Sequence, residues 1–182
     1  MFERALELAR DHDDFAAQIQ NYRIHTQFLV DGRQYERALA NCTAALNLQH
    51  HSPNSSNIPQ LHMLAAAAQG SLGDTAGALE TLEMGLASMT ALGMESSRYH
   101  YAVAAIEFKR ANFEEMIRHA LELDRLKPTE TSPLYFVLKE AHTGDVQSAL
   151  QQLRQLIDST PVSPLHLPTL LVYASVAVSL GR

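Results

Sequence analysis

Small and apolar residues recur along this chain at steps of three, four and three residues, in four separate stretches. In the first stretch, Tyr35 is followed at these steps by Ala38, Cys42 and Ala45. Such steps bring side chains to one side of an α-helix, because the helix makes one turn in about 3.6 residues. The pattern predicts four helices whose small residues let a neighbouring helix approach closely. The other three sets are Thr75, Ala78, Leu82 and Gly85; Phe113, Met116, Ala120 and Leu123; and Val146, Ala149, Leu153 and Leu156.

The four stretches are spaced like the units of a repeat protein. Their equivalent positions 38, 78, 116 and 149 are separated by 40, 38 and 33 residues. Units of this length with two helices each are typical of α-solenoids, in which antiparallel helix pairs stack on one another. We therefore predict an all-α fold with a single domain over residues 1–182. It should contain about four repeats and a partial unit at both ends.

Boundary signals divide the chain into these units. Asp14 is placed as an N-cap residue, and Pro59 suits the first turn of a helix. Because the predicted order starts with a second-type helix and stops after a first-type helix, we expect either a piece of a longer protein or a last helix covered by a second chain. The predicted units are a partial helix at 2–10, repeats at 15–49, 58–92, 96–127 and 132–160, and a terminal helix at 165–180.

The second helix of each unit resembles that of the tetratricopeptide repeat (TPR) family. The clearest match is Asn112 and Phe113 with the closing Pro128. The resemblance covers nearly the whole chain. It implies a right-handed α-solenoid whose first helices line a concave groove. Further matches are Tyr35 with Ala38 and Ala45, and Gly144 and Asp145 with Ala149 and Pro161; the first-helix positions are Tyr22/Thr26, His62/Ala66, His100/Ala104 and Pro133/Val137.

The resemblance also implies which side chains face that groove. We expect it to be polar near its N-terminal end and apolar further along, where Tyr101, Phe108 and Tyr135 are the best single anchors because aromatic side chains dominate interface energies. The alternative for each residue is ordinary packing between neighbouring first helices. The predicted groove residues are Arg23, Gln27, Gln60, Met63, Arg98, Tyr101, Phe108, Leu134, Tyr135 and Leu138.

The segment from Leu170 to Leu180 is apolar nearly all round the predicted helix. A solenoid usually ends instead with a polar capping helix. We therefore expect a contact patch that includes Leu171 and Val178. A homodimer through this helix is one way to cover the patch, and a frayed end is the alternative.

Composition and charge narrow the class of protein. The hydrophobic share of 46% and the charged share of 19% are typical of a folded domain. The net charge of −6 argues against a nucleic-acid surface, which needs a clustered basic face. A single cysteine, no visible signal peptide and no apolar run of about 20 residues favour an intracellular protein, cytoplasmic or nuclear, without a membrane partner.

The sequence contains no catalytic constellation. Cys42 could act as a nucleophile with His25 or His119, but its place on a stripe of small residues favours buried packing. The adjacent His50 and His51 could bind a metal, but a zinc site needs three or four ligands at set spacing, which favours a solvated loop. We therefore predict a protein that is not an enzyme and that holds no metal or cofactor.

The leading hypothesis is a protein–protein interaction scaffold, a TPR segment of a larger protein or complex that binds a protein, peptide or partner subunit in its groove. The long second helices, such as 75–92, also resemble the effector-sensing regulatory domains of large transcription regulators, which bind a small molecule or an inhibitory protein. The flanking sequence would distinguish the two, since such regulators carry an upstream nucleotide-binding domain or a downstream helix-turn-helix.

Overall fold

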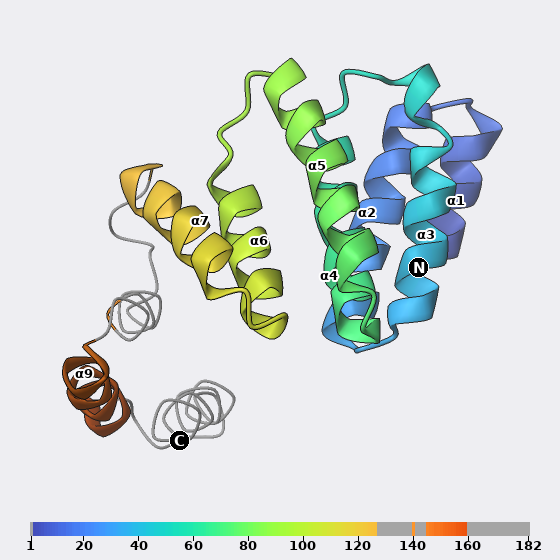
Figure 1. Ribbon diagram of the computed structural model, residues 1–182. Helices are drawn as coiled ribbons and strands as arrows, with labels where there is room; N and C mark the ends of the chain where they lie inside the picture. The colour runs from blue at the N-terminus through green and yellow to red at the C-terminus, as the bar shows by residue number, and fades with distance from the viewer. Residues whose placement is uncertain (1, 127–139, 141–144, 160–182) are drawn as a thin grey trace. The chain divides into compact units, whose positions relative to one another are not determined.

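The structure, a computed structural model, describes residues 2–126, 140 and 145–159 (Figure 1). Every regular element within these residues is helical and none is a strand, which confirms the all-α class for this part of the chain. The start of the repeat predicted at 132–160 and the terminal helix predicted at 165–180 lie outside the described residues. The elements are α1 (Phe2–Asp11), α2 (Phe15–Asp31), α3 (Tyr35–Leu46), the 3-10 helix η1 (Gln49–His51), α4 (Asn57–Leu72), α5 (Thr75–Ala91), α6 (Ser97–Lys109), α7 (Phe113–Leu126) and α9 (Val146–Ser159).

Contacts divide the chain into two units, Met1–Ile106 and Glu107–Arg182. In the first unit, α2 packs against α3 and α4 packs against α5 as two helix hairpins (Figure 1). In addition, α1 packs against α2, α3 packs against α4, and α2 contacts α4. Both helices of the first hairpin, α2 and α3, therefore contact α4 of the second.

The core of the first unit consists of clusters of buried side chains that join three helices each. One cluster joins α2, α3 and α4, and a second joins α4, α5 and α6. Because α4 contributes to both, it holds this unit together. The first cluster contains Ile19, Cys42, Ala45, Ile58, Leu61 and Ala65, and the second contains Ala66, Ala78, Leu82, Val103 and Ile106.

The eight positions that the sequence predicts to be packed most tightly are all buried. Burial confirms the helical register that the sequence predicts for both types of helix. A small side chain at such a position lets two helix backbones approach: a Cβ added at Gly85 of α5 would lie 3.1 Å from the Cβ of His62 on α4. The buried positions are Ala38, Ala45, Ala78, Leu82, Ala104, Ala120, Ala149 and Leu153.

The turns that follow α1, α2, α4, α5 and α6 share one type of backbone hydrogen bond. In each turn, a backbone N–H donates to the carbonyl oxygen five residues earlier, which is the outer bond of a Schellman helix end. The residue before the donor has a positive φ at Asp13, Arg33, Gly73, Gly93 and Ala111. The donor and acceptor pairs are Asp14 and Ala9, Gln34 and Leu29, Asp74 and Gln69, Met94 and Met89, and Asn112 and Glu107, at 2.7–3.0 Å.

Aspartate caps three helices in the same way. The Asp14 side chain accepts a hydrogen bond from the backbone N–H of Ala17 at 2.9 Å, as the sequence predicts. Asp74 and Asp145 accept the equivalent bonds at the start of α5 and α9, also at 2.9 Å. Each bond satisfies one N–H that the first helical turn leaves without a partner.

The chain leaves α3 earlier than predicted. The periodic pattern predicts a helix to about residue 49, but α3 ends at Leu46. The helical ladder tightens there, since the N–H of Leu48 donates to the carbonyl oxygen of Ala45, three residues back. This turn places Leu46 and Leu48 against the first core cluster, so tertiary packing overrides the local helical signal.

The described part of the second unit has its own buried stripes. Met116 of α7 and Leu153 of α9 are fully buried. Glutamate and arginine three residues apart form ion pairs on the surface of α7. The carboxylate of Glu140 accepts hydrogen bonds from Ser148 at 3.0 Å and from Gln152 at 2.5 Å, which ties it to α9.

Candidate functional site

The predicted groove residues that the structure describes lie on α2, α4 and α6, the first helices of three successive pairs. The predicted contact patch of the C-terminal helix and the fourth set of groove residues lie outside the described residues. The described set is Arg23 and Gln27 on α2, Gln60 and Met63 on α4, and Arg98, Tyr101 and Phe108 on α6; the set outside is Leu134, Tyr135, Leu138, Leu171 and Val178.

These first helices are direct neighbours. α2 contacts α4. A Cβ added at Gly70 of α4 would lie 3.6 Å from Cγ1 of Ile106 on α6, which is ordinary van der Waals contact. Side chains from α2, α4 and the part of α6 up to Ile106 can therefore contribute to one surface.

The groove residues of α2 and α4 differ in what they contact. Gln27 is exposed, and its Nε2 donates to Oδ1 of Asp31 at 2.9 Å. Arg23 is half-buried, and its Nε has no hydrogen-bond partner among the described residues. Met63 is half-buried and packs against the second core cluster, so ordinary packing accounts for it.

The start of α6 presents an aromatic and a cationic side chain to solvent. Tyr101 is 53% exposed. Arg98, three residues earlier on the same side of the helix, is also exposed. Phe108, further along α6, is half-buried.

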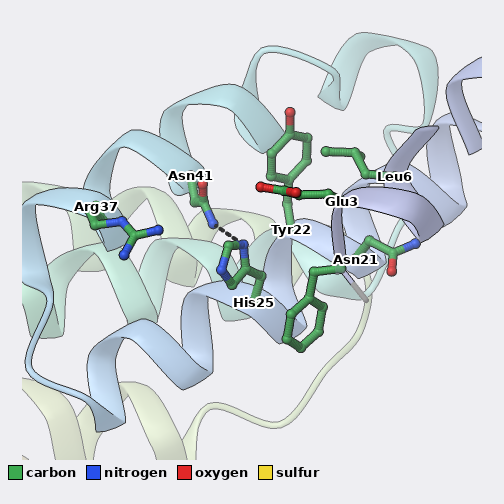
Figure 2. A pocket seen from close by; sticks show the side chains of 8 residues that line it. Glu3, Leu6, Asn21, Tyr22, His25, Arg37 and Asn41 are labelled. Carbon is green, nitrogen blue, oxygen red and sulfur yellow. Dashed lines mark hydrogen bonds between the residues drawn. The ribbon is translucent and has the colours of Figure 1, made fainter.

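A pocket of about 310 Å³ opens between α1, α2 and α3, and we call it the α1–α3 pocket (Figure 2). Side chains of opposite charge line it, together with aromatic, aliphatic and amide side chains. Its volume lies at the lower end of the roughly 300–1,000 Å³ that ligand pockets span. Its lining residues are Phe2, Glu3 and Leu6 of α1, Asn21, Tyr22 and His25 of α2, and Arg37 and Asn41 of α3.

Hydrogen bonds fix the polar side of this pocket. Nδ2 of Asn41 lies 3.0 Å from Nδ1 of His25, as the dashed line in Figure 2 marks. Nη2 of Arg10 donates to the hydroxyl oxygen of Tyr22 at 2.9 Å, which positions the phenol ring. Nη1 of Arg37 donates to Oε1 of Gln34 at 2.5 Å.

Aromatic rings continue from the pocket to the surface. The Phe2 ring stacks on the His25 ring with centroids 4.9 Å apart and an interplanar angle of 13°. The Phe2 ring also meets the ring of Phe28 at 5.4 Å, and Phe28 is 61% exposed. An apolar surface therefore extends along α1 and α2 beside the pocket.

The sequence carries a partial signal for this pocket. Asn21 and His25 are four residues apart, as are Arg37 and Asn41, so each pair shares one side of a predicted helix. The packing of α2 against α3 then brings the two pairs together, and no spacing along the chain encodes that. Tyr22 is identified from the sequence as a repeat position but not as part of a pocket.

Cys42 lies in the core. Its Sγ donates to the carbonyl oxygen of Leu61 at 3.4 Å. Burial raises the pKa of the Cys42 thiol to about 11, and the nearby Thr26 side chain offsets only part of that rise. A nucleophilic cysteine acts as the thiolate, so this buried thiol fits the packing role that the sequence predicts.

The adjacent histidines lie in η1 rather than in an open loop. The His51 ring stacks on Phe15 with centroids 3.9 Å apart, and the His50 ring lies 3.8 Å from the His51 ring. Both remain exposed. Within the part of the chain that the structure describes, no group of three or more His, Cys, Asp or Glu side chains could hold a metal ion.

Among the described helices, none is long and apolar enough to cross a membrane. A search of protein-family models, of curated proteins and of solved structures finds no match to this chain.

Proposed function

We propose that this chain is a protein–protein interaction module whose helix pairs form a right-handed α-solenoid of the TPR kind. The first helices α2 and α4 and the start of α6 bind a segment of a protein partner. The observation that carries the proposal is the exposure of Tyr101 beside Arg98 on α6, next to the first helix α4. Tyrosine and arginine are enriched among the residues that dominate binding energy at interfaces.

The chemistry of this face favours a particular kind of segment. Tyr101 offers a flat apolar ring, and Arg98 offers a cation three residues away. An amphipathic helix that places an apolar side chain near an acidic one matches both, and helices commonly bind to helical grooves in this way. The exposed amide of Gln27 on α2 adds a polar contact at the other end of the face.

Selection from a displayed peptide library against the whole chain tests the proposal. The affinity of a selected peptide is then measured by fluorescence polarisation for wild type and for Tyr101→Ala. We expect binding to weaken at least tenfold, which corresponds to about 1.4 kcal/mol. Arg98→Ala should lower the affinity for peptides that carry acidic residues and leave the affinity for neutral peptides unchanged.

Met84 provides a matched control. It is 52% exposed, close to the value for Tyr101, but it lies on the second-type helix α5. Met84→Ala should leave the affinity unchanged. Equal losses in both variants, or a loss for Met84→Ala alone, would contradict the proposed face.

A further inference from the structure

We infer that the α1–α3 pocket binds a free α-amino acid with an apolar side chain. In this arrangement, Arg37 and His25 contact the carboxylate, Glu3 contacts the ammonium group, and the side chain lies on the apolar lining. The inference stands independently of the proposed interaction face, because none of the pocket residues belongs to the groove residues on α2, α4 and α6.

The charges of the pocket carry the first step. Glu3 enters from α1 and Arg37 from α3, and both side chains are exposed to solvent. Within the described residues, neither forms a salt bridge with the other or with any third side chain. An anionic ligand is attracted by Arg37 but repelled by Glu3, and a cation meets the reverse. A ligand with one separated charge of each sign satisfies both residues.

The hydrogen-bond donors of His25 and Arg37 support the contact with a carboxylate. An amide nitrogen can only donate, so Nδ1 of His25 is the acceptor from Asn41, which leaves Nε2 as the ring nitrogen that carries a proton. That N–H remains available to a ligand oxygen. Arg37 uses one of its five N–H groups on Gln34, which leaves others for the two oxygens of a carboxylate. In the view of Figure 2, the His25–Asn41 pair lies between the Arg37 guanidinium and the Glu3 carboxylate.

The apolar lining and the size of the pocket carry the third step. Phe2, Leu6 and Tyr22 add aromatic and aliphatic carbon to the lining of the same pocket. A volume of about 310 Å³ has room for a small molecule. The stacking of Phe2 on His25 and the hydrogen bond of Tyr22 with Arg10 hold two of these rings in place before a ligand binds.

Isothermal titration calorimetry of the whole chain tests the assignment. The ligands are L-phenylalanine and L-leucine, compared with N-acetyl-L-phenylalanine, which lacks the ammonium charge, and L-phenylalaninamide, which lacks the carboxylate. We expect at least one free amino acid to bind and the derivatives of phenylalanine to bind at least tenfold more weakly than phenylalanine itself.

Charge-removing variants locate the contacts. Glu3→Gln and Arg37→Gln should each lower the affinity for the free amino acid at least tenfold. Arg37→Gln should lower the affinity for phenylalaninamide much less, because this ligand lacks the carboxylate that Arg37 contacts. The controls are Arg4→Gln on α1 and Glu36→Gln on α3, which are exposed neighbours of Glu3 and Arg37 outside the pocket lining. Both should bind like wild type, and circular dichroism checks that all variants fold.

Three results would overturn the inference. The first is no measurable binding of either free amino acid at millimolar concentration. The second is equal affinity for phenylalanine and one of its derivatives, which would mean that the pocket recognises only one of the two charged groups. The third is an equal loss of binding in the control variants. A peptide that still binds at Tyr101 in any of these cases leaves the interaction proposal intact.

Discussion

Ala111 follows α6 with a φ of 57°, in the left-handed region, where a Cβ is crowded by the following carbonyl oxygen. Gly73 holds the equivalent place after α4 with a φ of 94°. Ala111→Gly relieves roughly 1–2 kcal/mol of strain but gives the unfolded chain more freedom, which offsets about 0.4–1 kcal/mol. We therefore expect the free energy of unfolding in urea to rise by about 0.5–1 kcal/mol.

The opposite exchange provides the comparison. Gly73→Ala should lower the free energy of unfolding by about 1 kcal/mol, because it imposes the same strain. Ala87→Gly, on the exposed side of α5, should also lower it, by about 0.5–1 kcal/mol, since glycine weakens a helix interior. If Ala111→Gly destabilised the chain as Ala87→Gly does, the left-handed turn after α6 would be wrong.

His62 links the stability of the first unit to pH. The side chain is 7% exposed, and its Nδ1 has no hydrogen-bond partner among the described residues. Burial lowers the pKa of His62, because desolvation disfavours the charged imidazolium. The unfolded chain takes up the proton near pH 6.5, so this contribution to stability is complete above about that pH. It is lost progressively as the pH falls from there toward the lower pKa of the folded protein.

Removing the imidazole should remove that dependence. We expect the free energy of unfolding of His62→Met to fall less than that of wild type between about pH 7.5 and pH 5, as measured by urea denaturation at each pH. His12→Gln, an exposed change in the turn after α1, should keep the wild-type dependence. An unchanged slope in His62→Met would mean that the buried ring does not titrate as its burial indicates.

Some single-residue features could be predicted from the sequence and others could not. Asp14 as an N-cap and Cys42 as a buried thiol both follow from residue type and local position. The positive φ of Arg33 does not, because Gly32 is the residue that a turn would be expected to use, and it keeps a negative φ of −80°. The hydrogen bond from the N–H of Gln34 to the carbonyl oxygen of Leu29, five residues earlier, places the left-handed residue at position 33.

Among the helices, α5 gives the sharpest test of the packing pattern. Ala78 is fully buried and contributes to the cluster that joins α4, α5 and α6. Ala78→Phe should lower the free energy of unfolding by roughly 1–3 kcal/mol or more, because the core has no room for the ring. Ala87→Phe, on the exposed side of the same helix, should be tolerated. Equal melting temperatures for the two variants would contradict the assigned register.

The sequence predicts which side of each helix is buried better than it predicts where a helix ends. Burial follows from periodicity alone, so Ala38, Ala78 and Ala149 are identified without knowledge of their neighbours. The end of α3 at Leu46 depends on how Leu48 packs against α2 and α4, which is a tertiary effect. Local periodicity extends the helix instead to about residue 49.

At the scale of the whole molecule, the sequence indicates a repeated helix pair, and the structure adds which of the expected groove side chains are exposed. The resemblance treats Met63 and Tyr101 as equivalent groove positions, but Met63 packs into a core cluster while Tyr101 is exposed. The α1–α3 pocket depends on three helices meeting, so the spacing of residues along the chain could not reveal it. Both differences arise from packing between helices.

Site-specific photocrosslinking tests the proposed interaction face most directly. A peptide selected on the wild-type chain is irradiated with two variants that carry p-benzoylphenylalanine, one in place of Tyr101 on α6 and one in place of Met84 on α5. Both positions are similarly exposed, so exposure alone cannot produce a difference. We predict a crosslink from position 101 and none from position 84. A crosslink from position 84 with none from position 101 would contradict binding on the first helices.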